Sequence, residues 1–169
     1  MVPKILFDLS RIDQAAIEIP LEEIRRHNPQ RFEFEQLDGV FRILPEEGFI
    51  IGFKDVRKDE FWVRGHIPGM PLLPGVLMIE AGAQLCAVYQ SMVCPSSGFF
   101  GFGGLEAVKF RAAVRPGDRL ILLGQAVQVH RRRSVFNVQG LVGGTLAFEA
   151  TVIGIAIPRK QADPAPPQV

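Results

Sequence analysis

The segment Gly65-His66-Ile67-Pro68-Gly69-Met70-Pro71-Leu72-Leu73-Pro74-Gly75-Val76-Leu77-Met78-Ile79-Glu80 is the most informative stretch of the chain. Its prolines recur at every third position, which holds the backbone extended before a helix begins. From Val76 to Val93 almost every side chain is apolar, so this helix is expected in the interior. Glu80 and Gln84 are four residues apart and share one helical face. That face and the nearby His66 are the first candidates for chemistry.

Length and composition indicate an ordinary globular protein. The 169 residues, 47% hydrophobic and 22% charged, suffice for one core and predict a single domain. A net charge of +1 gives no general attraction to nucleic acid or to membranes. Cys86 and Cys94 have neither the spacing nor the histidine partner of a metal site, so no metal is expected. Reduced cysteines fit a cytoplasmic setting.

No export signal or membrane span is predicted. Asp8, Arg11 and Asp13 interrupt the apolar stretch near the amino terminus before it reaches the length of a signal core. The run from Val76 to Val93 is at the short limit for a membrane span and contains Glu80. A core helix is therefore the preferred interpretation.

The order of predicted elements indicates the fold class. We expect residues 1–19 to form an extension over the domain, 20–157 the domain itself, and 158–169 a proline-rich flexible tail. The predicted elements are a short helix at 20–27, a hairpin of 36–44 and 48–56, a short strand at 61–63, the long helix, and strands near 99–114, 118–132, 134–143 and 145–157. One long apolar helix among antiparallel strands predicts an α+β fold with a curved sheet wrapped around that helix.

Three blocks of sequence together resemble a known family. After the opening segment, which continues as Ala81-x-Ala83-Gln84, come Lys109-Phe110-Arg111 with Val114-x-Pro116-Gly117-Asp118, and then Phe148-Glu149-Ala150-Thr151. In this order they resemble, over roughly residues 20–157, the 3-hydroxyacyl-[acyl carrier protein] dehydratases of bacterial fatty-acid synthesis, which have the hot-dog fold.

The resemblance implies an activity and an assembly. It implies that a (3R)-3-hydroxyacyl thioester on acyl carrier protein loses water to give the trans-2-enoyl thioester. It implies His66 and Glu80 as the catalytic pair, with the acid contributed across a two-fold dimer interface. It further implies a homodimer or a trimer of dimers, and no cofactor beyond the phosphopantetheine that carries the substrate. The glutamate at position 80 is similar to the branch that does not isomerise the double bond.

The chemistry of dehydration assigns further roles. The reaction needs a base for the C2 proton, an acid for the leaving hydroxyl, and donors to the thioester oxygen. His66 is the candidate base, Glu80 the candidate acid, and the Gly75 N–H at the helix start the candidate donor. Gln84 either orients Glu80 or makes a polar packing contact. The residues expected to line the substrate tunnel are Ile67, Pro68, Leu72 and Val76.

The chain also departs from the family pattern. Ile67 stands where phenylalanine is usual, Gly82 where methionine is common, and Gln30 where a Pro-His-Arg motif would place a histidine. These departures affect the expected chain-length preference and rate more than the type of reaction.

A basic run lies at the end of the predicted strand near 118–132, close to the hairpin end. Arg131, Arg132 and Arg133, together with Lys109 or Arg111, are a candidate docking patch for an acidic carrier protein, and a solvated hairpin end is the alternative. No aromatic residues alternate with these basic residues, which argues against nucleic-acid binding.

Two other functions stay open from the sequence. Hot-dog proteins include thioesterases and hydratases that act on coenzyme A esters, because fold alone does not determine the reaction. A non-catalytic acyl-binding module is the third possibility, although the presence of both His66 and Glu80 argues against it.

Overall fold

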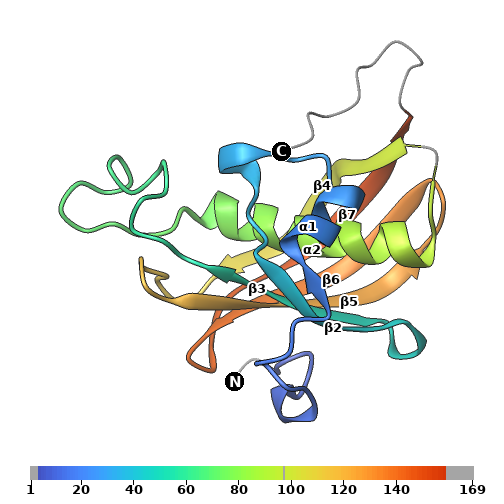
Figure 1. Ribbon diagram of the computed structural model, residues 1–169, viewed down its shortest axis with the longest axis horizontal. Coiled ribbons are helices and arrows are strands. Elements are labelled where there is room, and N and C mark those ends of the chain that lie inside the picture. Colours follow the sequence, from blue (N-terminus) through green and yellow to red (C-terminus); the bar gives the residue numbers. More distant parts are fainter. Residues whose placement is uncertain (1–3, 97, 159–169) are drawn as a thin grey trace.

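One helix lies inside a strongly curved antiparallel sheet (Figure 1). The computed structural model describes residues 4–96 and 98–158. The helices are α1 (Leu21–His27) and α2 (Gly75–Val93), with short 3-10 turns at Leu9–Arg11, Phe32–Phe34 and Pro45–Glu47. The strands are β1 (Ile19–Pro20), β2 (Gly39–Leu44), β3 (Phe49–Asp55), β4 (Gly98–Phe110), β5 (Arg119–Val129), β6 (Arg133–Val142) and β7 (Thr145–Pro158). Their order in the sheet is β1-β2-β3-β5-β6-β7-β4. This is the predicted hot-dog arrangement.

The helix α2 is the centre of the main core. Strands β3 to β7 all pack on it, and Ala81, Leu85 and Val88 are fully buried. By length and composition alone α2 could cross a membrane, but 56% of its most apolar window is buried in the protein. It is therefore a core helix, as the polar residues within it indicate.

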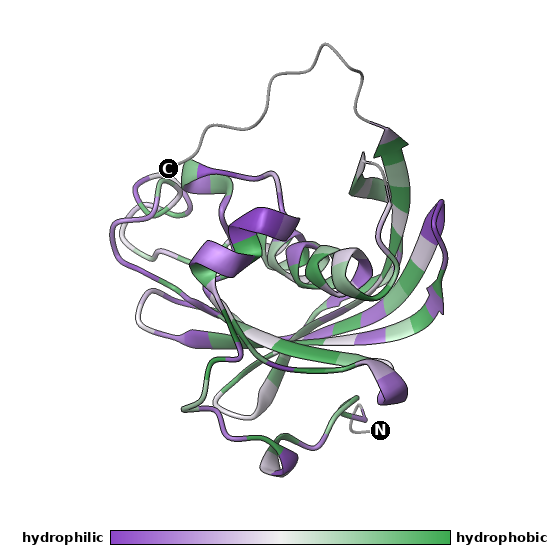
Figure 2. Cartoon of the chain, turned by 45° about the vertical axis from the view of Figure 1, so that its right-hand side comes forward, coloured by the Kyte–Doolittle hydropathy of each residue, from purple (hydrophilic) through white to green (hydrophobic). Residues whose placement is uncertain are grey.

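A second core lies on the outer face of the sheet. Phe7 is buried there against Phe41, Phe53 and their neighbours on β2, β3, β5 and β6, and the amino-terminal residues pass below the sheet in Figure 2. The amide of Gln139 fixes this segment, because Oε1 accepts from the Leu6 N–H at 2.8 Å and Nε2 donates to the Lys4 carbonyl at 3.0 Å. The sheet is thus covered on both faces, by α2 and by residues 4–12.

Most of the predicted helices and strands are present, but the prediction of one strand is wrong. The hairpin of β2 and β3 turns at Pro45–Glu47, with Gly48 at φ 74° in the left-handed region that favours glycine. The strand predicted at 61–63 does not form. The Val63 N–H donates to the Glu60 carbonyl at 3.0 Å, so this segment is a turn. Of the expected flexible tail, Pro158 ends β7, and residues 159–169 lie outside the described residues.

Gly82 is required by the packing of α2 on β6. A Cβ atom at position 82 would lie 2.6 Å from Cγ1 of Val138, which is buried. Alanine favours a helix by about 1 kcal/mol over glycine, but overpacking a core costs about 1–3 kcal/mol. We expect Gly82→Ala to lower the free energy of unfolding by roughly 1 kcal/mol net, measured by urea denaturation.

The partner substitution provides the control for Gly82. Val138→Ala removes the obstructing methyl groups, so the two substitutions together are expected to cost less than the sum of their separate effects. Strict additivity, or a more stable Gly82→Ala protein, would show that the close approach of helix and strand is not the reason for the glycine.

Candidate active site

His66 lies on the long loop between β3 and α2, residues 56–74. Its Nδ1 is 2.7 Å from the Leu72 carbonyl oxygen, and the Leu72 N–H donates to the His66 carbonyl at 2.9 Å. A carbonyl can only accept, so Nδ1 carries the proton and the other ring nitrogen, Nε2, is left as an acceptor. The His66 side chain is exposed on the surface of the single chain. It is therefore oriented and accessible, as a general base must be.

Glu80 lies one turn inside α2 and is half-buried. Its Oε1 accepts from Gln84 Nε2 at 2.7 Å and from Gln30 Nε2 at 3.3 Å. Both amides contact the same oxygen, and among the described residues no donor contacts Oε2. The carboxyl group is thus held by one oxygen, while the other is available to a ligand.

Gln84 fixes more than Glu80. Its Nε2 also donates to the Phe34 carbonyl at 2.7 Å, and its Oε1 accepts from the Gln36 N–H at 2.9 Å. The backbone carbonyl of Gln84 accepts from Asn28 Nδ2 at 3.0 Å. Gln84 therefore orients Glu80 and at the same time attaches residues 28–36 to α2, so both alternatives from the sequence apply.

Gln30 also belongs to the site, because it contacts Glu80. Its place in the sequence, where the family's Pro-His-Arg motif has histidine, is the signal that could have predicted this contact. The sequence marked it only as a departure from the family, yet its Nε2 contacts Glu80. Its Oε1 is buried with no donor among the described residues.

The two glutamines allow a matched prediction of stability. Gln84→Leu leaves the buried Gln36 N–H and the partly buried Phe34 carbonyl without partners, and an unsatisfied buried group costs about 1–3 kcal/mol. Gln30→Leu loses one long hydrogen bond and removes an unsatisfied acceptor, so its effect on unfolding is expected to be small. Urea midpoints of the two variants test this difference. Equal midpoints would mean that Gln84 does not hold residues 28–36.

A narrow cavity of about 80 Å³ extends from Glu80 along α2 toward Gln90. Its walls come from one face of α2 and from β4, β6 and β7, and they are mainly apolar. The lining residues are Gln30, Glu80, Ala83, Gln84, Cys86, Ala87, Gln90, Phe99, Phe100, Gly101, Phe102, Ser134, Phe136, Val152 and Gly154. An apolar channel that begins at a carboxyl group suits an acyl chain whose reacting end lies at Glu80.

The predicted tunnel residues do not line this cavity. Ile67 and Val76 are 45% and 71% exposed, Pro68 is also exposed, and Leu72 is half-buried. They lie at or just before the start of α2, whereas the channel follows the helix beyond Glu80, where β4 and β7 cover it. The assignment of these four residues to a substrate tunnel therefore stays a prediction, and it does not concern this cavity.

Gly75 opens α2, as predicted. Among the described residues the N–H groups of Gly75 and Val76 have no acceptor, because the first turn of a helix provides none. A Cβ at position 75 would lie 2.6 Å from the ring of Phe110, so glycine allows β4 to approach the helix start. Two backbone donors are thus available about one helical turn from Glu80.

Within the described residues, no hydrogen bond or ion pair joins His66 to Glu80. Within the described chain, His66 is not among the residues that line the cavity at Glu80. His66 projects from the loop before α2, and Glu80 faces the channel beside β4.

The basic residues expected to form one patch lie in two places. Lys109 pairs with Glu149 on β7, and Arg133 pairs with Ile155. Six residues of strand separate these positions, about 20 Å at 3.3 Å per residue. A hydrogen bond from Arg111, and the nearby charges of Arg111 and Lys109, hold the pKa of the Glu149 carboxyl below its usual range. In one chain, Lys109 and Arg111 therefore do not share a patch with Arg131, Arg132 and Arg133.

A family model described as the FabA-like domain matches residues 28–151. The chain belongs to the FabA-like family. The 3-hydroxyacyl-[acyl-carrier-protein] dehydratase FabZ of Acinetobacter baylyi is 33% identical to this FabA-like chain over 146 residues, 84% of the chain and 97% of the relative.

Solved structures share the fold of this FabA-like chain. The dehydratase heterocomplex ApeI:P of Xenorhabdus doucetiae gives a TM-score of 0.68 at 17% identity, covering 80% of this chain and 91% of that chain. A hypothetical thioesterase with coenzyme A from Streptococcus pneumoniae gives a TM-score of 0.53 at 12% identity, covering 72% of this chain and 87% of that chain. At these identities the likeness concerns the fold alone.

Proposed function

We propose that this protein removes water from (3R)-3-hydroxyacyl thioesters on acyl carrier protein and forms trans-2-enoyl thioesters in fatty-acid or related acyl biosynthesis. Relatives named 3-hydroxyacyl-[acyl-carrier-protein] dehydratase support the reaction. The observation that carries it is the Glu80 carboxyl group in the lining of an apolar cavity. Among the described residues, no donor contacts its Oε2, and the first two N–H groups of the same helix have no acceptor.

Each group has one step in the elimination. His66 Nε2 takes the C2 proton, and the electrons of the C2–H bond form the C2–C3 double bond. The C3–O bond breaks, and its electron pair leaves with the hydroxyl oxygen, which receives a proton from Glu80 Oε2 and departs as water. The N–H groups of Gly75 and Val76 stabilise the charge on the thioester oxygen, and one such donor is typically worth roughly 3 kcal/mol. All of this chemistry comes from protein groups, so the proposal includes no cofactor.

The proposed assembly would bring together two side chains that make no contact with each other in the described residues. We propose a homodimer, or a trimer of dimers, in which His66 of one protomer faces Glu80 of its partner. The edge strand β4 supports this proposal. In the part of the chain that the structure describes, it pairs on one side only, with β7, and it exposes Phe102, Leu105 and Phe110. Long exposed apolar edge strands are sites of pairing with another chain. The tunnel residues Ile67, Pro68 and Val76 would then face the partner.

Carrier docking is assigned to the end of the molecule where α2 begins. Lys109 and Arg111 flank Phe110, whose ring lies over Gly75, so a carrier bound there delivers its thioester to the helix start. Arg131, Arg132 and Arg133 lie toward the other end of β6 and form a separate, second basic site. The proposed setting is the cytoplasm, where acyl carrier protein is made and used.

One assay separates this function from its two rivals. Pure protein is incubated with 3-hydroxyacyl thioesters of acyl carrier protein and of coenzyme A, and both enoyl absorbance and free thiol are followed. Enoyl product with preference for the carrier-bound substrate supports the proposal. Release of free thiol would indicate a thioesterase. Enoyl product with preference for the coenzyme A substrate would indicate a hydratase, and the absence of both signals would indicate an acyl-binding module.

A further inference from the structure

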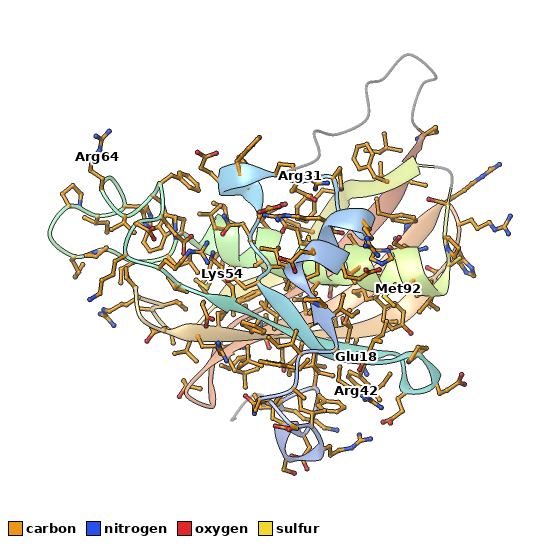
Figure 3. All side chains as sticks on the ribbon, in the orientation of Figure 1. Glu18, Arg31, Arg42, Lys54, Arg64 and Met92 are labelled. Atoms are coloured by element: carbon orange, nitrogen blue, oxygen red, sulfur yellow. The ribbon has the colours of Figure 1, made fainter. Side chains whose placement is uncertain are left out.

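The loop that carries His66 has few buried residues. Of residues 56–74 only Val56, Trp62 and Leu73 are buried, and Arg64 points away from the body of the protein in Figure 3. A loop with so few apolar contacts depends on a small number of anchors for its conformation. The position of His66 is therefore determined by whatever holds Trp62 and its neighbours.

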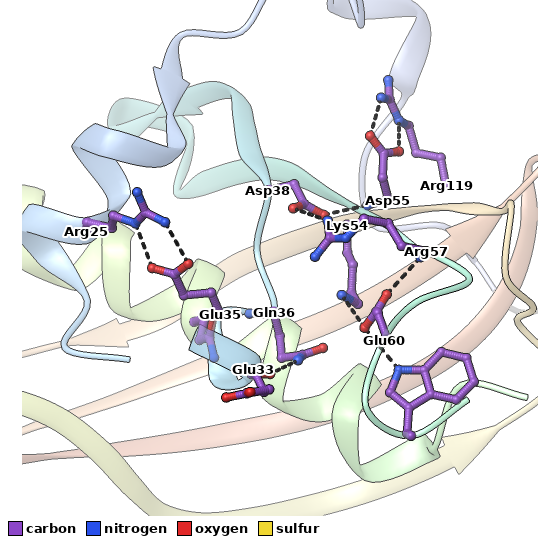
Figure 4. A network of polar contacts seen from close by, with 12 residues as sticks. Arg25, Glu33, Glu35, Gln36, Asp38, Lys54, Asp55, Arg57, Glu60 and Arg119 are labelled. Carbon is purple, nitrogen blue, oxygen red and sulfur yellow. Dashed lines mark hydrogen bonds and ion pairs between the residues drawn. The ribbon is translucent and has the colours of Figure 1, made fainter. Parts of the chain in front are cut away.

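A buried ion pair joins this loop to strand β3. Lys54 on β3 is fully buried, and its Nζ lies 3.0 Å from Oε2 of Glu60, whose side chain is 6% exposed (Figure 4). The neighbouring carboxylates have other partners. Asp55 pairs with Arg119 at 2.6 Å, and Asp38 pairs with Arg57 at 2.9 Å. A lysine is almost never fully buried without a partner. Lys54 is thus dedicated to Glu60.

The Glu60 carboxylate connects three parts of the chain. Besides Lys54, Oε2 accepts from Trp62 Nε1 at 3.0 Å, and Oε1 accepts from the Arg57 N–H at 2.9 Å. The core strand, the beginning of the loop and the buried indole are therefore all attached to one side chain.

The backbone of Trp62 is hydrogen-bonded to His66. Its carbonyl accepts from the N–H groups of Gly65 at 3.1 Å and of His66 at 2.8 Å. On the other side, the two contacts with Leu72 fix the His66 carbonyl and ring. Direct contacts thus run from Lys54 through Glu60 and Trp62 to His66.

We propose that Lys54 and Glu60 are positioning residues, which set the place of the His66 ring through Trp62. The catalytic consequence rests on the proposed function, whereas the placement of the ring does not. A buried ion pair is weak evidence for a role in stability, since replacing both partners by well-packed apolar residues of similar volume is often neutral. An apolar pair cannot, however, accept hydrogen bonds from Trp62 Nε1 and the Arg57 N–H.

The double variant Lys54→Met/Glu60→Leu separates these two roles. It removes the buried charges together, so its urea midpoint is expected to fall less than that of Glu60→Ala does; the loss that remains comes from the unpaired indole N–H of Trp62. It also removes the acceptors, so kcat is expected to fall roughly 10- to 100-fold with little change in KM. Lys54→Met/Glu60→Gln retains one acceptor oxygen and should recover part of this loss.

Two further variants serve as controls, one for the indole hydrogen bond and one for a general effect of losing an ion pair near Lys54. Trp62→Phe keeps a buried aromatic ring, although a smaller one, and removes the indole N–H while Glu60 and Lys54 stay paired, so it is expected to fold and to lose a smaller part of kcat. Arg119→Met breaks the exposed pair with Asp55 beside Lys54, and its kcat should equal that of the wild type. If Arg119→Met lowers kcat as much as the buried variants do, the effect is not specific to the His66 connection and the proposal fails.

The NMR signal of the His66 ring reports its position without any measurement of enzyme activity. The chain has three histidines, and the NMR signal of His66 is the one absent from His66→Asn. In Lys54→Met/Glu60→Leu this signal should shift or broaden, while the signals of His27 and His130 stay in place. A folded double variant with an unchanged His66 signal and wild-type kcat would overturn the proposal. A wild type that dehydrates nothing would overturn only the proposed function, because the NMR result still tests the positioning.

Discussion

Replacing Glu80 by glutamine is expected to lower kcat for dehydration by a factor of roughly 10² to 10⁴, the usual contribution of a general acid or base. Glutamine keeps the shape of the side chain, and its oxygen can still accept from Gln84 Nε2, so the fold should persist. It cannot deliver a proton to the leaving hydroxyl. Steady-state kinetics with a carrier-bound substrate measures the loss, and circular dichroism with urea unfolding verifies the fold. Wild-type turnover would refute the assignment of Glu80.

Mixing two inactive variants tests how the site is shared. His66→Asn should be impaired to a similar degree, because it lacks the ring nitrogen that takes the C2 proton. If a site uses His66 of one protomer and Glu80 of the other, half of the sites in a mixed dimer contain both native residues. Refolding equal amounts of the two variants together should therefore restore about a quarter of wild-type activity. No recovery, with mixed dimers demonstrated by differential tagging, would contradict a shared site.

Replacing Glu60 by alanine is expected to be among the most destabilising single substitutions in this chain. It leaves the ammonium of Lys54 buried without its carboxylate, and removing one partner of a buried pair costs about 3–5 kcal/mol. It also removes the acceptor for Trp62 Nε1 and the Arg57 N–H. Urea denaturation at neutral pH measures the loss in the free energy of unfolding.

A surface pair serves as the comparison for Glu60. Arg11 and Glu47 contact each other at 2.8 Å, but both side chains are more than 40% exposed, and such pairs contribute about 0–1 kcal/mol. Glu47→Ala should therefore change the urea midpoint very little. If Glu60→Ala were equally mild, water or another residue would have to reach Lys54, and the burial of this pair would not determine the stability of the region.

The sequence predicts the fold well because its signals are local. The apolar run of α2, the turn at Pro45–Glu47 and the Arg115-Pro116-Gly117-Asp118 turn each appear within a few residues, and each is present in the structure. The strand predicted at 61–63 fails for the opposite reason. Its aromatic composition favours a strand, but Glu60 draws Trp62 back toward Lys54, and no local pattern reveals that buried pair.

The candidate site is predictable to a smaller extent. The hydrogen bond between Gln84 and Glu80 follows from their spacing on one helical face, and the unpaired N–H of Gly75 follows from the helix start. The channel depends on which strands cover α2, and the separation of Lys109 from Arg133 depends on the register of β4, β7 and β6. These are long-range relations that residue types alone do not determine.

The amino-terminal segment over the sheet bears on how the protein can be shortened. Strands β3 and β5 contain uninterrupted runs of buried residues, such as Leu120 to Leu123, because residues 4–12 replace solvent on the outer side. A form trimmed to begin at residue 20 would expose Phe41, Ile51, Phe53 and Leu123 to water. We expect such a form to aggregate in light-scattering measurements even with its active site intact, so efforts to crystallise or engineer the enzyme should retain its first residues.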